Sequence, residues 1–296
     1  MGAPASGAAA VSAAEREGTK LENLAWRNRD ELLRFADLTL VEFLRHNARY
    51  GQGSKVVEED GLVLFAGPHP HPNPYRSGVF RTDNRLPAVE ALDRAHGFFA
   101  GLNRSYVVWV REKDPELDEV CRSRAMRLLE PDGLSEMVLE QAPPEVKAPP
   151  EGVVVTRVAD EATRSDYLHV VAEGWGMPGT PLDVAAGIFF DPDSVDVPNM
   201  IAFVAYVDGK PASGAMTFLS HGIAFGGQGA TVPWARRRGL AELCYGAALW
   251  AAYDEWNVRG SVCQSSPSGA GVWGAMGYRA FTKYMRYVGQ PTAAWE

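Results

Sequence analysis

The sequence predicts an α/β protein made of two domains. Segments with apolar residues at helical spacing alternate along the chain with short runs rich in Val, Phe and Tyr, which are typical of strands. The 296 residues exceed the size at which one core usually stops growing. Two Pro-Pro pairs in QAPPEVKAPPEG exclude a continuous helix there. We therefore expect a disordered tail at 1–20, a first domain at 21–141, a proline-rich linker at 142–151 and a second domain at 152–296.

The expected elements follow a similar order in the two domains. Upstream of the linker we expect a helix within 21–50, strands at 61–67 and 78–82, a helix at 87–102, a strand at 105–112, a helix at 114–129 and a strand at 134–140. Downstream we expect a strand at 152–158, helices at 162–175 and 181–190, a hairpin at 200–220, a Gly-rich strand at 223–232, a helix at 236–256, a strand at 260–266, a short helix at 268–276 and a last strand at 278–288. The recurring order suggests a duplication.

Charge and composition limit the partners. A formal net charge of -8 disfavours general binding to nucleic acid or anionic membranes, which needs a broad basic field. The three cysteines lack metal-ligand spacing and fit reduced thiols in the cytoplasm. No apolar run reaches the ~18 residues that span a bilayer. We expect a soluble cytoplasmic protein, able to form a homodimer, with no metal site.

The stretch ATVPWARRRGLAEL (230–243) predicts a seat for a phosphate group. It places the end of a strand directly before a helix, and the N–H groups of a helix's first turn have no intrahelical partners. The helix dipole adds positive potential there, so an anion is favoured. Gly239 allows close approach to the backbone, and Arg236, Arg237 and Arg238 can add charge-assisted bonds. The alternative is a solvated helix start whose arginines pair with carboxylates.

This stretch resembles the central motif of the GCN5-related N-acetyltransferase superfamily. Its pattern Q/R-x-x-G-x-G/A is met by Arg236, Gly239 and Ala241, and QSSPSGAGVWGAMGYRAF (264–281) resembles the family's second half. The resemblance covers about residues 151–288 and implies a mixed, mostly antiparallel central sheet flanked by helices. It also implies that acetyl-CoA donates an acetyl group to an amine. The cofactor-binding residues that it implies are Ala230, Thr231, Val232, Arg236, Arg237, Arg238, Gly239, Leu240, Ala241, Ser266, Gly269 and Trp273.

The same resemblance implies an oxyanion donor, a base and an acid. The backbone of 229–232 would lie along pantetheine and supply the oxyanion donor. The family's usual tyrosine is replaced by Trp273, which donates a hydrogen bond but is not an acid; we read it as a packing residue. The strand before the phosphate motif has only Gln228 where many relatives have a glutamate. Candidate catalytic residues are therefore sought elsewhere: Glu173, His221 and Tyr278.

The acceptor is expected to be a small amine. The segment that often walls the acceptor pocket in this family holds Glu173, Trp175 and Met177. The first domain lacks the phosphate motif, so it is expected to be a degenerate copy of the fold that shapes the substrate site. The alternative function is an acyl-CoA-binding protein of the same fold that is weak or inactive in catalysis. The missing tyrosine and glutamate motivate that alternative.

Overall fold

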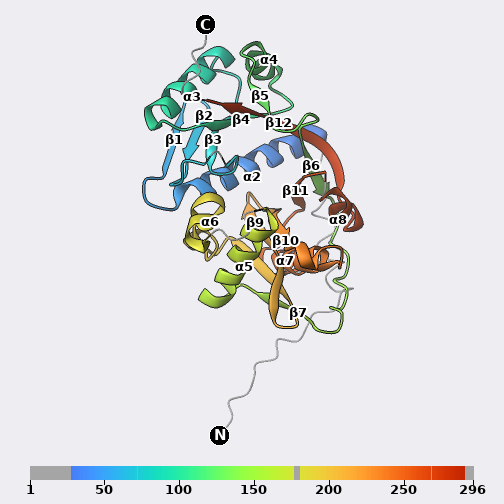
Figure 1. The fold of residues 1–296 in the computed structure, drawn as a ribbon. Helices are drawn as coiled ribbons and strands as arrows, with labels where there is room; N and C mark the ends of the chain where they lie inside the picture. The colour runs from blue at the N-terminus through green and yellow to red at the C-terminus, as the bar shows by residue number, and fades with distance from the viewer. Residues whose placement is uncertain (1–27, 72, 177–180, 268, 291–296) are drawn as a thin grey trace.

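A computed structural model describes residues 28–71, 73–176, 181–267 and 269–290 (Figure 1). The helices are α2 (Arg29–Arg49), α3 (Ala88–Leu102), α4 (Pro115–Ser123), α5 (Glu161–Gly174), α6 (Leu182–Phe189), α7 (Leu240–Trp256) and α8 (Ala270–Ala275). The strands are β1 (Lys55–Glu59), β2 (Leu62–Ala66), β3 (Ser77–Arg81), β4 (Tyr106–Val110), β5 (Arg127–Leu128), β6 (Leu134–Leu139), β7 (Val153–Arg157), β8 (Met200–Val207), β9 (Lys210–Ser220), β10 (Ile223–Thr231), β11 (Ser261–Ser265) and β12 (Arg279–Gly289).

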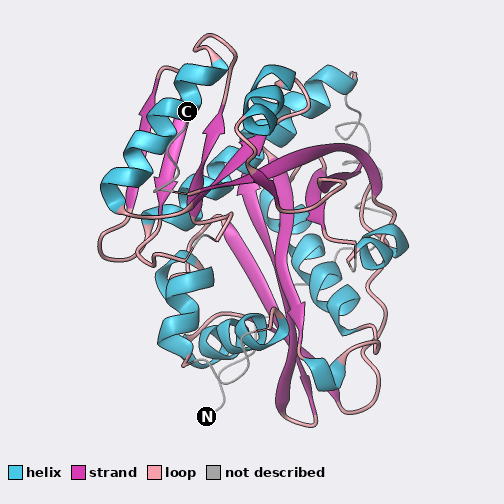
Figure 2. Cartoon of the chain, turned by 45° about the horizontal axis from the view of Figure 1, so that its top comes forward, coloured by secondary structure: helices cyan, strands magenta, loops and turns pink. Residues whose placement is uncertain are grey.

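The sheet is mixed and mostly antiparallel, which confirms the predicted fold class. Its strands follow the order β1-β2-β3-β4-β12-β6-β11-β10-β9-β8-β7, with β5 beside β12. Of the described strand pairs, β3–β4 and β10–β11 are parallel and the rest are antiparallel. Helices flank this sheet along its length (Figure 2). Each half of the chain, 28–140 and 152–290, contains one parallel strand pair whose two strands are joined by a helix, α3 in the first half and α7 in the second.

The two halves of the chain exchange strands. The last strand of the N-terminal half, β6, lies between β11 and β12 of the C-terminal half. The end of β12, residues 285–289, in turn pairs with β4 and continues the N-terminal part of the sheet. Figure 1 shows β12 as one long strand that runs across both parts. The hydrogen bonding of each half thus depends on the other half.

Helix α2 adds a second link between the halves, because its apolar residues are divided between two cores. Leu40 and Leu44 are buried with Phe65 and Trp109 of the N-terminal half. Phe43 is buried with Phe218 and Phe225 of the C-terminal half, at ring distances of 5.4 and 4.7 Å.

None of the described helices is both long and apolar enough to cross a membrane.

Two expected boundaries differ from the structure, and one strand was not expected. The expected helix at 114–129 ends at Ser123, because Ala125 adopts a φ of 50° and β5 follows at Arg127. The short exposed strand β1 was not predicted. The helix expected from Arg236 begins instead at Leu240, after a 3-10 turn at Pro233–Ala235. The disordered tail predicted at 1–20 lies outside the described residues.

Candidate active site

A cavity of about 990 Å³ lies where β10 and β11 separate. The parallel pairing of these strands ends at Gly226 and Cys263, although β10 continues to Thr231. The backbone of residues 227–231 therefore has no strand on the β11 side and faces the cavity. Its lining comprises Phe43, His71, Asn73, Pro74, Tyr75, Leu134, Gly174, Trp175, Phe189, Phe225, Gly227, Gln228, Gly229, Ala230, Thr231, Ala235, Arg236, Arg237, Gly239, Leu240, Ala241, Glu242, Tyr245, Gln264, Ser266, Gly269, Val272, Trp273 and Arg286.

A β-bulge in β10 shapes the floor of this cavity. Gly227 pairs with Met216 and Ala230 with Gly214, so residues 228 and 229 both face the single residue between those partners. Gln228 has a φ of 46°, in the left-handed region. Bulges interrupt the ladder and leave backbone groups available for other partners. The centre of the cavity therefore has an extended strand edge that no neighbouring strand covers.

The start of α7 forms one end of the cavity. Gly239 has a φ of 75° and no side chain caps the helix, whose first backbone bond runs from the N–H of Leu243 to the Gly239 carbonyl. The N–H groups of Leu240, Ala241 and Glu242 consequently lack intrahelical acceptors. All three residues line the cavity. This end offers convergent N–H donors together with the positive end of a 17-residue helix.

The three arginines before α7 have different surroundings. The Arg236 guanidinium donates to the backbone carbonyls of Thr231 (3.1 Å) and Gly174 (2.9 Å), so it ties the end of β10 to the end of α5. Arg237 is exposed and lines the cavity, with a φ of 65°. Arg238 is exposed and does not line it. Of the three, Arg237 is thus the cation best placed to meet an anion at the helix start.

Two aromatic side chains hold the bulge at Gly229. The Trp175 Nε1–H donates to the Gly229 carbonyl at 3.1 Å, and the indole packs edge-on against Phe189. On the other side, the Tyr245 hydroxyl lies so close that a Cβ on residue 229 would be 2.1 Å from it. A residue with a Cβ would therefore not fit at position 229. Trp175 and Tyr245 together fix the shape of the bulge.

The structure brings most of the predicted cofactor residues to this cavity. Ala230, Thr231, Arg236, Arg237, Gly239, Leu240, Ala241, Ser266, Gly269 and Trp273 line it, as does the predicted substrate residue Trp175. Val232 is buried and donates its N–H to the Ala212 carbonyl on β9, so it faces away from the cavity. Trp273 is buried against Tyr245, with ring centroids 4.1 Å apart, which agrees with a packing role.

The predicted catalytic side chains are not among the lining residues. The carboxylate of Glu173 lies 3.2 Å from the exposed His169, one turn earlier on α5. His221 is in the turn before β10, at the opposite end of that strand from the cavity, and contacts Ser220. Tyr278 is buried behind Trp273 and shares a 2.6 Å hydrogen bond with Ser261. Burial raises the pKa of Tyr278 far above its usual value. The predicted substrate residue Met177 lies outside the described residues.

The N-terminal half supplies a wall that the sequence did not indicate. Tyr75 lines the cavity and its hydroxyl donates to Oε1 of Gln264 on β11 at 2.8 Å. Burial raises the pKa of Tyr75 to about 12, so the phenol stays protonated. Arg286 of β12 lines the same wall, with its guanidinium 5.9 Å from the centroid of the Tyr75 ring. No local pattern connects these residues, because strand exchange alone brings them together.

The carboxyl group of Glu136 is buried directly behind this wall. Glu136 on β6 is in register with Gln264 on β11 and is fully buried. Burial raises its pKa well above the usual value, which the neighbouring Gln264 side chain partly offsets. The group therefore favours its uncharged acid form.

Among the described residues, no cluster of three or more His, Cys, Asp or Glu side chains is suited to hold a metal ion.

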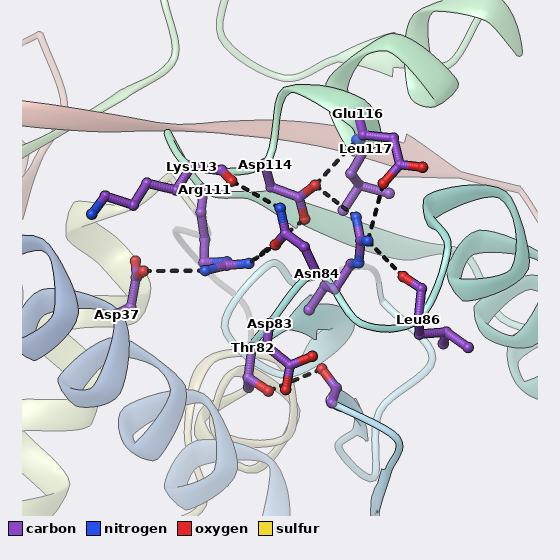
Figure 3. Close-up of polar contacts among 12 residues, drawn as sticks. Asp37, Thr82, Asp83, Asn84, Leu86, Arg111, Lys113, Asp114, Glu116 and Leu117 are labelled. Atoms are coloured by element: carbon purple, nitrogen blue, oxygen red, sulfur yellow. Dashed lines mark hydrogen bonds and ion pairs between the residues drawn. The ribbon is translucent and has the colours of Figure 1, made fainter.

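The equivalent junction in the N-terminal half is closed by side chains (Figure 3). There the parallel strands β3 and β4 are followed by loops that bind each other. Arg81 at the end of β3 is 1% exposed and donates to Asp114 in the loop after β4 at 2.7 Å. Asn84 and Arg111 add further bonds between the two loops. This network occupies the place where, in the C-terminal half, the strands separate and a cavity opens.

Comparisons with known proteins show which solved structures share this fold. No family model matches the sequence, and no curated protein is significantly similar to it. Among solved structures, a GCN5-related N-acetyltransferase from Kribbella flavida superposes with a TM-score of 0.67 at 17% identity, over 88% of this chain and 96% of that one. A GCN5-related N-acetyltransferase from Sphaerobacter thermophilus gives a TM-score of 0.56 at 13% identity, over 88% and 94%.

A third solved structure is similar over nearly its whole length. A tandem GNAT protein from the clavulanic acid biosynthesis pathway gives a TM-score of 0.58 at 12% identity, over 88% of this chain and 97% of that one. The likeness covers nearly the whole length of each of these chains. At such identities the comparison establishes the fold, and the chain has the fold of the GCN5-related N-acetyltransferases.

Proposed function

We propose that this protein transfers an acetyl group from acetyl-CoA to the amine of a small molecule. The observation that carries this proposal is one cavity that joins a free strand edge, at 227–231, to the uncapped start of α7. The helix start and Arg237 suit the pyrophosphate of CoA. The strand edge suits the amide groups of pantetheine, which can pair with it as another strand would.

The local geometry fits such a ligand. Gly239 takes a φ that other residues rarely adopt, and open space surrounds the position of its missing Cβ. Along β10, the small residues Gly227, Gly229 and Ala230 line the cavity. Acetyl-CoA would supply an activated thioester, and attack by the amine nitrogen forms the C–N bond, breaks the C–S bond and releases CoA with loss of the amine proton.

The chain's residues would orient this reaction rather than supply a strong acid. Trp175 and Tyr245 fix the bulge at Gly229, where backbone N–H groups can stabilise charge on the thioester oxygen. A thiol pKa of about 8.5 allows the thiolate to leave without a dedicated donor. Glu242 is the carboxylate among the described lining residues, and it is paired with Lys147 at 2.7 Å.

Binding and transfer can be tested together. We expect CoA to bind the wild-type protein in calorimetry, and acetyl-CoA to yield N-acetylated products with part of a panel of small amines. Arg237→Ala should weaken CoA binding about tenfold, since a charge-assisted bond contributes ~1.5–3 kcal/mol. Arg238→Ala is the matched control, because Arg238 is equally exposed but does not line the cavity. Equal losses for the two variants would contradict the proposed seat.

A second candidate function is acyl-CoA binding without catalysis. It is favoured by the positions of Glu173, His221 and Tyr278, none of which lines the cavity. Tight CoA binding with no product from any amine of the panel would support this candidate. Absence of CoA binding would exclude both functions.

A further inference from the structure

Arg286 leaves one hydrogen-bond donor unused at the wall of the cavity. Its side chain lies over the Trp109 ring at 5.0 Å, and the residue is 6% exposed. Nε and Nη2 both donate to the carboxylate of Glu130, whereas Nη1 is buried without a partner. A buried donor without a partner costs about 1–3 kcal/mol, so such a group at a cavity wall indicates a ligand.

Two glutamines show the same property beside the same cavity. Gln228 lines the cavity at the bulge and is 7% exposed, and neither its amide nitrogen nor its amide oxygen has a partner. Gln264 uses its oxygen to accept from Tyr75, but its Nε2 is buried without a partner. Among the residues that line the cavity, the unpartnered set therefore holds three N–H-bearing nitrogens and one oxygen, and both carboxyl oxygens of Glu136 behind the wall are unpartnered as well.

Arg286 and Gln264 are at the end of the cavity opposite the start of α7, and Gln228 lies at the bulge between the two ends. Tyr75 and Phe225 both contact Phe43, at ring distances of 6.1 and 4.7 Å, and Phe225 precedes Thr231 by six residues along β10. At about 3.3 Å per residue that separation is ~20 Å. A CoA whose pyrophosphate lies at α7 would therefore point its thioester toward Gln228 and Arg286. The polar wall faces the place of the acceptor.

We propose that the acceptor amine carries a carboxylate, which binds Arg286 and the amides of Gln264 and Gln228; this inference rests on the proposed acetyl transfer. Among the unpartnered groups of the lining residues the donors outnumber the acceptors, which suits an oxygen-rich group. The charge of Arg286 is balanced by Glu130, and Glu136 behind the wall favours its uncharged form. The wall therefore suits a single negative charge better than a dianionic phosphate. Amino acids, rather than simple amines, form the predicted substrate class.

The test compares amines that differ only in the carboxylate. The probes are L-phenylalanine with phenethylamine, γ-aminobutyrate with butylamine, and phosphoethanolamine as the phosphate-bearing amine. We expect kcat/KM to be at least tenfold higher for one or both carboxylated members than for their partners. Gln228→Leu, Gln264→Leu and the double variant Arg286→Met/Glu130→Gln should each reduce this preference severalfold, through KM more than kcat. The double variant avoids leaving the half-buried carboxylate of Glu130 without its cation.

Arg279→Met is the matched control, because Arg279 is on the same strand, pairs with Glu140 and does not line the cavity. The preference of this variant for carboxylated over uncarboxylated amines should equal that of the wild type. Equal use of carboxylated and uncarboxylated amines, preference for phosphoethanolamine, or an unchanged preference in all three wall variants would overturn the inference.

A binding measurement separates this inference from the proposed reaction. N-acetyl-L-phenylalanine and N-phenethylacetamide are titrated into the full-length protein in the presence of CoA, without any turnover. We expect the carboxylated compound to bind more tightly in the wild type and in Arg279→Met, and to lose that advantage in the wall variants. If no amine is acetylated but this pattern appears, the reaction is wrong and the carboxylate site stands. If amines are acetylated and the pattern is absent, the carboxylate site is wrong.

Discussion

At the scale of single residues, Asp37 on α2 predicts a measurable dependence of stability on pH. Its carboxylate accepts from the Tyr284 hydroxyl at 2.8 Å and lies 3.7 Å from Arg111. Burial outweighs these contacts and raises its pKa to about 6. Because the folded pKa exceeds the unfolded value of about 3.9, the stability that it contributes is complete below pH ~4 and is lost as the pH rises through 6.

Asp37→Asn should therefore stabilise the protein above pH 7 by up to ~3 kcal/mol and have little effect near pH 4. Urea unfolding from pH 4 to 8 measures this difference. Asp30→Asn on the same helix is the control, because the hydrogen bond from Lys113 lowers the pKa of the exposed Asp30. The pH dependence of the stability that Asp30 contributes has the opposite sign, so this stability is lost as the pH falls. A pH-independent effect of Asp37→Asn would contradict the assignment.

Residues of the site were predictable where their roles depend on local sequence. Gly239 and Ala241 are close to the strand end and helix start that they serve, so the local sequence and its resemblance to the family motif indicated them. Arg236 was predicted to bind an anion, but its guanidinium binds two backbone carbonyls, which spacing does not specify. Tyr75 and Arg286 reach the cavity through long-range pairing of strands, and their local sequences hold no sign of it.

At the scale of elements, the start of α7 depends on the backbone conformation of Gly239. A left-handed φ costs a residue with a Cβ about 1–2 kcal/mol. Gly239→Ala should therefore lower the free energy of unfolding by about 1 kcal/mol and weaken CoA binding, both measurable by urea unfolding and calorimetry. Gly271 in α8 is the control: a Cβ added there would likewise meet no atom within 4 Å, but the φ of Gly271 is not positive.

Gly271→Ala should be neutral or stabilise the protein by up to ~1 kcal/mol, since alanine is the better helix former. If the two variants behave alike, backbone strain at Gly239 is not what fixes the helix start. The same conformation explains why the predicted helix began too early. Pro233 and the left-handed Arg237 and Gly239 form a turn, whereas the helical pattern of apolar residues gives no sign of where that turn ends.

At the scale of the whole molecule, strand exchange makes the two halves one folding unit. The element order of each half was predictable because apolar periodicity is local, whereas the insertion of β6 between β11 and β12 is not encoded in any short pattern. The proline-rich segment also differs from a free linker. Trp250 of α7 donates to the Pro144 carbonyl at 2.7 Å, and Lys147 pairs with Glu242. The segment is thus held against α7.

Cutting the chain in this segment should leave the protein intact under native conditions. A protease site inserted between Pro150 and Glu151, both exposed, severs the covalent link but spares the pairing of β6 with β11 and of β12 with β4. We expect the cleaved protein to elute as a single species on size-exclusion chromatography, to unfold in one transition and to bind CoA with unchanged affinity. The uncleaved insertion variant is the control. Because each fragment completes the sheet of the other, separating the fragments should require denaturant. Two fragments that elute apart in native buffer would show that the exchanged strands do not hold the halves together.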